Sequence, residues 1–275
     1  MYSPQQNQKA WTPGASLFNT RGMRMLKLSP TLALLTVFAA CTSGPALDSY
    51  PRREIDRPLT LPAGVATWHI PTVAGLVKDH DRSTGIPPIT VPLIWESAIA
   101  DDWTLIWAPI PLGVVHQLWN NDDSRAGLSL TFAMAYGSER GFAWSPAASF
   151  AYRHKFDETL ALDVIPSATI TFEGDEGQDH WSIGVASGPL FQISDTFAFS
   201  TKIIAGASKG GLKISSTGLE GIKRTNEEAF SFGLSVDGTW SFARQWDLRP
   251  LYSFSMIGGS QNQLHLAVID FVHFW

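Results

Sequence analysis

Residues 230–242 read FSFGLSVDGTWSF, a stretch in which large apolar side chains alternate with small or polar ones. The large members are Phe230, Phe232, Leu234, Val236, Trp240 and Phe242. A period of two places successive side chains on opposite faces of a β-strand. Weaker forms of this alternation run from about residue 60 to the C-terminus, and helical periodicity is hard to find there. The sequence therefore predicts an all-β fold.

The face that carries the small residues indicates the environment of these strands. It consists of Ser, Ala, Gly and Thr with isolated charges, whereas the solvated face of a soluble sandwich is rich in charged side chains. Small residues suit an enclosed lumen, and a continuous Leu, Phe, Trp and Val face suits lipid. Aromatic residues near segment ends match interfacial girdles: Trp144, Tyr152, Trp181, Trp240 and Tyr252. We expect an antiparallel transmembrane β-barrel.

Counting segments back from the C-terminus predicts twelve strands. Their ranges are 263–275, 247–257, 226–242, 196–209, 179–193, 159–172, 141–154, 127–137, 111–119, 103–110, 91–99 and 64–74. Pro109 and Pro111 disfavour the two strands that contain them, so ten strands is the alternative. Residues 72–88 are a candidate for a segment inserted into the lumen.

Composition excludes several other classes. Of the 275 residues 44% are apolar and only 16% are charged, yet no run of about 18 apolar residues suggests a membrane-spanning helix. The net charge of −5, with scattered Lys and Arg, gives no basic footprint for nucleic acid. A single cysteine excludes a disulfide framework and a Cys-rich zinc site. No cofactor or metal site is expected.

The N-terminal region has the anatomy of an export signal. Basic residues precede a short apolar stretch, Leu28–Ala40, which ends in small side chains. The end of this stretch together with the next residue, FAAC at 38–41, resembles the lipobox of bacterial lipoproteins. That resemblance implies lipidation of Cys41 and cleavage just before it. We predict an N-terminal extension with an export signal over 1–40, a lipid-anchored periplasmic tether over 41–59 and a barrel over 60–275.

The C-terminal segment LHLAVIDFVHFW, residues 264–275, resembles the last strand of bacterial outer-membrane barrels. That resemblance implies localisation in the cell outer membrane and recognition of the terminal aromatic residue by the barrel-insertion machinery. Alternation is imperfect in this segment, because Val268 and Asp270 share a face. The expected partners are outer-membrane lipids and anionic glycolipid headgroups; the oligomeric state stays open.

Isolated charges on the small face are the candidate site residues. They are Arg153, Asp163, Lys202, Asp237 and Arg249. Each lies a few residues from a predicted short turn, which places them in the periplasmic half of the lumen. Two roles are open: an ion-pair network that stiffens the barrel, or a charged constriction that selects small solutes.

Catalytic patterns are weak. Gly206–Gly210 matches the G-x-S-x-G pattern with Ser208 as nucleophile, but that pattern needs a strand followed by a helix. We predict no enzyme and no catalytic residues. The leading hypothesis is a narrow pore for small solutes or lipids. The alternative is a structural or interaction protein of the envelope with a plugged lumen, and a lipid-modifying enzyme is a weak third.

Overall fold

Thirteen strands make up most of the part of the chain that the computed structural model describes, which is residues 45–79, 82–90, 94–107, 112–137, 141–173, 180–214, 222–257 and 262–275. The strands are β1 (Ala66–Asp79), β2 (Arg82–Thr90), β3 (Ile94–Ala100), β4 (Trp103–Trp107), β5 (Leu112–Asn120), β6 (Ser124–Gly137), β7 (Gly141–Lys155), β8 (Leu160–Glu173), β9 (His180–Ser194), β10 (Phe197–Ile214), β11 (Ile222–Ala243), β12 (Trp246–Ile257) and β13 (Asn262–Phe274). No described helix is long and apolar enough to cross a membrane.

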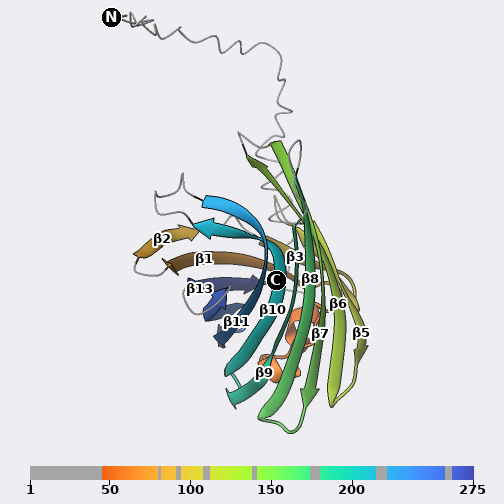
Figure 1. The fold of residues 1–275 in the computed structure, drawn as a ribbon. Helices are drawn as coiled ribbons and strands as arrows, with labels where there is room; N and C mark the ends of the chain where they lie inside the picture. The colour runs from red at the N-terminus through yellow and green to blue at the C-terminus, as the bar shows by residue number, and fades with distance from the viewer. Residues whose placement is uncertain are drawn as a thin grey trace, which may run out of the picture. The chain divides into compact units, whose positions relative to one another are not determined.

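The sheet closes on itself, because β13 pairs antiparallel with β1 from Thr67↔Phe274 to Asp79↔Asn262. From β3 to β13 each strand also pairs antiparallel with the next one along the chain (Figure 1). β2 and β3 both pair with β1, at Thr72–Asp79 and Ala66–His69 respectively, so they occupy one position in the wall. The result is a closed antiparallel barrel of twelve positions.

The predicted count of twelve is confirmed, and the alternative of ten is wrong. Pro109 and Pro111, on which the alternative rested, lie outside the described residues, between the end of β4 at Trp107 and the start of β5 at Leu112. The interpretation of residues 72–88 as a luminal insertion is also wrong. The described residues of this range, 72–79 and 82–88, belong to β1 and β2, which pair with each other within the wall.

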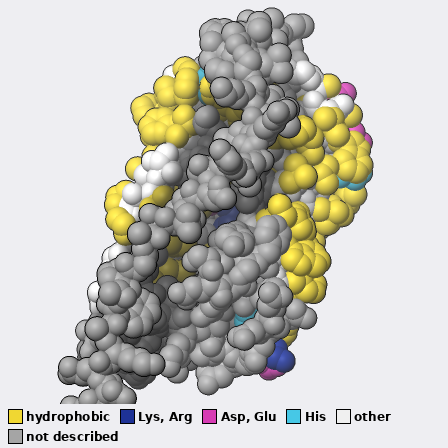
Figure 2. Space-filling view, turned by 90° about the horizontal axis from the view of Figure 1, so that it is seen from above, with side chains coloured by type: hydrophobic (Ala, Val, Ile, Leu, Met, Phe, Trp, Pro, Cys, Tyr) yellow, Lys and Arg dark blue, Asp and Glu magenta, His cyan; other side chains and the backbone are white. Residues whose placement is uncertain are grey.

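The two faces of the wall are oriented as the alternation predicted. In β11 the large apolar side chains point outward, with Phe230 79% and Leu234 51% exposed. Their neighbours point inward, and Ser235 and Ser241 are only 7% and 2% exposed. Figure 2 shows hydrophobic side chains gathered on the described outer surface. An apolar exterior of this kind is suited to lipid contact.

One end of the barrel carries short turns, and it also holds the C-terminus. The turns join β3 to β4, β5 to β6, β7 to β8, β9 to β10 and β11 to β12. Trp275 exchanges two backbone hydrogen bonds with Ala66 at this end. We call it the short-turn end; in outer-membrane barrels such turns face the periplasm.

Residues 45–63, called the luminal segment below, lie inside the barrel at the short-turn end. The segment contains α2 (Pro45–Ser49) and the 3-10 helix η1 (Glu54–Asp56). It touches β5, β7, β9 and β12, strands on different sides of the wall that only an interior position can reach. Residues 45–59 of the predicted tether are therefore not a free linker, whereas the proposed anchor Cys41 lies outside the described residues.

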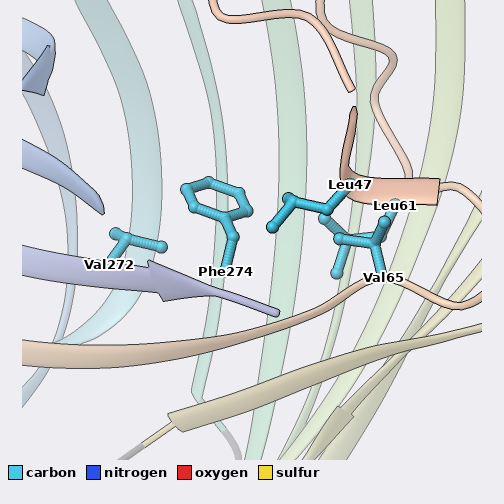
Figure 3. Close-up of a cluster of buried hydrophobic side chains, with 5 residues drawn as sticks. All are labelled: Leu47, Leu61, Val65, Val272 and Phe274. Carbon is cyan, nitrogen blue, oxygen red and sulfur yellow. The ribbon is translucent and has the colours of Figure 1, made fainter. Parts of the chain in front are cut away.

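Two small hydrophobic clusters fix the luminal segment. Figure 3 shows the first, in which Leu47 and Leu61 pack against the barrel residue Phe274. Val65 and Val272 complete this cluster. In the second, the fully buried Ile55 packs against small and apolar side chains of the wall: Ala161, Leu190 and Ala198.

Candidate functional site in the barrel lumen

The five charges predicted to line the lumen all lie on the inner face of the wall. Arg153 of β7 and Asp163 of β8 are register partners and form a two-pronged ion pair, with Nε–Oδ1 at 2.7 Å and Nη2–Oδ2 at 3.1 Å. Both are buried. Arg153 Nη1 also donates to the backbone carbonyl of Glu54, 2.7 Å away, so this pair holds the luminal segment.

Lys202 and Asp237 form a second pair on β10 and β11, with Nζ–Oδ2 at 2.7 Å. Ser200, which is fully buried, donates to the same carboxylate oxygen at 2.7 Å. No described contact links this group to the luminal segment. Asp237 nevertheless interacts electrostatically with Arg153, which binds the segment.

Arg249 of β12 is paired with Asp247, at 3.1 Å between Nη2 and Oδ2. Asp247 is almost completely buried and makes a closer pair with Arg57 of the luminal segment. Ser241 donates to Asp247 at 2.8 Å and accepts from Arg57 at 2.8 Å, which closes a three-residue network. Of the five predicted charges, the Arg153–Asp163 pair and Arg249 lie beside the luminal segment, whereas Lys202 and Asp237 make no described contact with it.

Sequence reasoning missed Arg57 and Asp247. Arg57 lies in a polar stretch without periodicity, and Asp247 adjoins a turn, so neither had a signal of its own. Burial opposes the charge of Arg57, yet Glu54 and Asp247 keep its pKa above the usual range. The Arg57 guanidinium also lies 5.5 Å from the ring centres of both Tyr50 and Phe274. Burial raises the pKa of Tyr50 to about 12, so this phenol is neutral at physiological pH.

Other basic residues of the wall also bind the luminal segment. Arg125 donates to the carbonyls of Ile55 and Arg57, the latter at 3.1 Å. Lys155 pairs with Asp56 at 2.8 Å. The amide of Ile55 donates to Gln192 Oε1 at 3.0 Å. The inward register of Arg125 and Gln192 was a usable signal, but nothing in the sequence showed what they would bind.

A cavity of about 210 Å³ lies between the luminal segment and the inner wall of the barrel. Most of its lining is polar, and it includes charged side chains of both the segment and the wall: Glu54, Arg57, His69, Glu96, Arg153 and Arg249. Leu59, Val272 and Phe274 are among the fewer apolar residues. His69 and Val272 are register partners, so polar and apolar groups are interspersed.

His69 is held from both sides in this cavity. Its Nδ1 lies 2.8 Å from Asp270 Oδ2, and its Nε2 lies 3.2 Å from the hydroxyl of Thr67 and 3.6 Å from Glu96. A general base needs a ring nitrogen that is open to a substrate proton, and both nitrogens are occupied here. The group therefore forms an ion-pair network rather than a catalytic triad.

The other candidates for chemistry are not assembled. Ser208 lies within a continuous ladder, paired with Ser182 and Ala229, and not at the strand-to-helix turn that a nucleophile of its pattern requires. Within the described ranges, no three His, Cys, Asp or Glu side chains are arranged to hold a metal ion. Cys41 lies outside the described residues.

Comparison with known proteins identifies the type of barrel. The fold is similar to the COG4313 outer membrane channel from Pseudomonas putida F1, at a TM-score of 0.54 and 12% sequence identity over 78% of this chain and 97% of that one. Similarity to a loop-deletion mutant of OmpT, an outer membrane protein of Vibrio cholerae, is lower (TM-score 0.37, 5% identity, 77% and 99% covered). The CymD monoaromatic hydrocarbon channel gives 0.38, 8% identity and coverages of 76% and 87%.

No protein-family model matches the chain, and no curated protein sequence matches it. The first of the three structures shows that this is an outer-membrane β-barrel fold. The two TM-scores below 0.5 are too low to extend that conclusion.

Proposed function

We propose that the protein is an outer-membrane channel for small solutes, closed at its periplasmic end by its own luminal segment. The supporting observation is the way in which that segment is held. Arg125, Arg153 and Lys155 bind its carbonyl and carboxylate oxygens, Arg57 of the segment pairs with Asp247, and two small hydrophobic clusters add to these polar contacts. Contacts of this polar kind exchange with water at modest net cost, which suits a segment that leaves the lumen.

A structural role with a permanently plugged lumen is the second candidate. It is favoured by the burial of Arg57 and Asp247, because breaking a buried ion pair costs about 3–5 kcal/mol. The two candidates differ in whether the segment ever leaves. We propose neither a catalytic role nor a cofactor.

Conductance of the full chain in planar lipid bilayers separates the candidates. For the channel we expect rare openings in the unmodified protein and an open probability at least tenfold higher in Asp247→Asn, since the neutral side chain no longer pairs with Arg57. Arg244→Gln is the matched control, because Arg244 contacts the same segment through exposed groups. Absence of conductance from correctly inserted protein and from Asp247→Asn would establish the structural role instead.

The luminal charges Lys202 and Asp237 are proposed to set ion preference. They lie on the inner wall without a described contact to the luminal segment, so they stay in place when it moves. Lys202→Gln is expected to shift the reversal potential of the open channel toward cation preference and Asp237→Asn toward anion preference. Equal reversal potentials in both variants would show that Lys202 and Asp237 do not line the path of the solute.

Lipidation of Cys41 anchors the segment in this proposal. Arg244, in the turn between β11 and β12, contacts the carbonyls of Leu47 and Asp48, which places α2 at the short-turn end. Asp48 is seven positions after Cys41, and seven residues of fully extended chain span at most about 25 Å. Cys41→Ser is expected to abolish incorporation of labelled palmitate, and unchanged labelling would refute the anchor.

A further inference from the structure

The wall of the barrel is not complete over its full height. β4 has five residues, whereas a strand that crosses a bilayer needs about 9–11. Only four residues join Trp107, at the end of β4, to its register partner Leu112 at the start of β5. So short a connection cannot extend both strands to the opposite end of the barrel. The twelve positions are therefore all filled toward the short-turn end, whereas the wall between β2 and β6 is interrupted toward the opposite end.

Two strand edges border this interruption, which we call the lateral opening. Among the described strands, β2 pairs only with β1, so its other edge has no partner strand. On the other side, β6 pairs with β5 only as far as Phe132, and within the described ladders Ala133–Gly137 pair with β7 alone. Figure 1 shows β2 beside β1 and apart from β6. Two absent strand positions correspond to about 10 Å of wall.

The lateral opening lies at the level of the lipid-facing surface. Thr72 of β1 is the register partner of both Thr90 of β2 and Ile269 of β13, and Ile269 is exposed on the outer surface. Beside the other edge, Met134 of β6 is exposed in the same outward direction as Phe132. Unpaired strand edges at membrane depth are tolerated only where they line a cavity. An opening that joins the lumen to the bilayer meets that condition.

The sequence of β2 keeps its free edge unpaired. Pro87 and Pro88 have no backbone N–H, and the register between β1 and β2 shifts opposite them, between Val73 and Gly75. Consecutive residues of a strand direct their hydrogen-bonding groups to opposite edges, so one of the two prolines removes a donor from the free edge. Proline on an edge strand opposes pairing with another chain. The edge is therefore suited to remain open rather than to bind a second copy of the protein.

The inner wall beside the lateral opening is apolar. A row of four apolar side chains begins at β2 and crosses four neighbouring strands in register: Ile89, Val73, Val268 and Leu251. Further inward positions on β1 and β13 carry Val77, Leu264 and Leu266. We call these seven residues the apolar luminal patch.

Register fixes the inward direction of the patch. Val268 shares its face of β13 with Val272, which packs against the luminal segment. Leu251 shares its face of β12 with Asp247, which pairs with that segment inside the barrel. The patch therefore accounts for the broken alternation around Val268, since both faces of β13 are apolar there.

The patch leads to the lateral opening and not to the charged cavity. The next inward row toward the short-turn end consists of Pro71, Asp270 and Arg249, and it lies between the patch and the cavity beside the luminal segment. A molecule on the patch can thus reach the bilayer without passing the luminal segment.

The opposite inner wall is different. On β6 to β11, the inward positions outside the charged pairs carry mainly Ser, Thr, Gly and Ala, with Ile165, Leu190 and Ile204 as larger exceptions. Inner walls of outer-membrane barrels are generally polar. Apolar surface left against water is unfavourable in proportion to its area, so a patch concentrated beside the lateral opening indicates an apolar occupant for part of the time.

We propose that uncharged apolar molecules pass through the lateral opening between the lumen and the surrounding bilayer, and that the apolar luminal patch is their path along the wall. The route crosses neither the luminal segment nor the row of Pro71, Asp270 and Arg249. It therefore operates while the segment closes the short-turn end, and it goes beyond the proposed channel function without depending on release of the segment.

Photo-crosslinking of the full chain in phosphatidylcholine nanodiscs tests the opening. The photoreactive residue p-benzoylphenylalanine replaces one side chain at a time, and mass spectrometry detects its adducts with phospholipid acyl chains. Val73 and Ile89 of the patch are compared with two reference positions, Leu234 on the outer surface and Ser182, which points inward from β9 on the opposite wall. A sealed wall keeps acyl chains from every inward position. We expect yields at Val73 and Ile89 close to that at Leu234 and about tenfold above that at Ser182, because the polar wall excludes hydrocarbon.

The class of molecule is tested by adding n-octane to the same nanodiscs. We expect octane adducts at Val73, with the yield reduced about tenfold by Ile89→Arg, because a charge at the border of the opening holds water there. Ser182→Arg is the matched control, since it places the same charge on the opposite inner wall, and it is expected to leave the yield unchanged. Circular dichroism confirms that each variant retains its β-structure.

Each contrary result overturns a stated part. Absence of phospholipid adducts at Val73 and Ile89, with normal labelling at Leu234, rejects the lateral opening, and equal labelling at Ser182 rejects its location between β2 and β6. Cross-links between two copies of the chain in place of lipid adducts would make this edge a subunit interface and reject the passage. An octane yield that Ile89→Arg leaves unchanged rejects the patch as the path. Lipid and octane adducts in a protein without conductance retain the lateral route and reject the channel, while conductance without adducts does the reverse.

Discussion

Arg57 and Asp247 are 190 residues apart in the sequence and form a buried ion pair in the barrel interior. Arg57 comes from the luminal segment and Asp247 from the wall, so the pair can form only while the segment is inside the barrel. Ser241 and Arg249 add polar contacts to the same carboxylate. Because each partner is desolvated, losing one leaves the other uncompensated.

Arg57→Gln is expected to release the luminal segment. Loss of the buried charge pair is worth about 3–5 kcal/mol, enough to make the released state at least a hundredfold more populated. Limited trypsin digestion after Arg52 and Arg53 measures this population through the cleavage rate. Arg244→Gln serves as the control, since an exposed pair is worth about 1 kcal/mol or less. Equal cleavage rates in the two variants would show that the ion pair does not hold the segment.

Ile55→Ala tests the second hydrophobic cluster. The side chain is fully buried against Ala161, Leu190 and Ala198, and truncating a buried isoleucine costs about 2–5 kcal/mol. The amide of residue 55, which donates to Gln192 Oε1, is expected to exchange its hydrogen at least tenfold faster than in the unmodified protein. Ile99→Ala, on the exposed outer surface, is expected to leave that exchange rate unchanged.

Leu234→Arg tests the outward orientation of β11. A charged side chain near the centre of the lipid-facing surface costs about 2–4 kcal/mol of folding free energy in a bilayer. Phe156→Arg is the matched control, because Phe156 is as exposed, at 58%, but lies in a short turn outside the strands. Equilibrium unfolding from lipid vesicles in urea measures both. Similar losses in the two variants would mean that Leu234 does not face lipid.

Acid is expected to loosen the contact between the luminal segment and the turn that joins β7 to β8. Arg53 and then Lys155 hold the pKa of Glu158 below its ordinary value of 4.5, with Arg53 Nη1 2.6 Å from Glu158 Oε2. A carboxylate with a lowered pKa stabilises the folded arrangement above its unfolded pKa, and this contribution disappears as the pH falls through the folded value. Tryptic cleavage after Arg53 cannot be followed at such pH, so pepsin digestion of the segment between pH 5 and 2 is the measurement. Glu158→Gln should remove this component of the pH dependence, and an unaltered profile would contradict the assignment.

The class of fold was predictable because it depends on local alternation. Phe230 to Phe242 show which face is apolar, and the small partners on the other face exclude a solvated sandwich. The inward positions of Arg153, Asp163, Lys202, Asp237 and Arg249 followed from the same period. The strand count also followed, apart from β2, whose Ile86-Pro87-Pro88 stretch gave no strand signal of its own.

The sequence by itself determined an all-β membrane barrel, the identity of its lipid-facing side chains and the charges that point inward. These features were predictable because a period of two can be recognised from residues that are adjacent in the sequence. Only the tertiary structure decided that residues 45–63 occupy the lumen, that Arg57 meets Asp247 and that apolar side chains from β2, β1, β13 and β12 form one patch. These relationships depend on barrel closure and on the register between distant strands. Hydrogen bonding across the seam fixes both, and no local pattern in the chain encodes them.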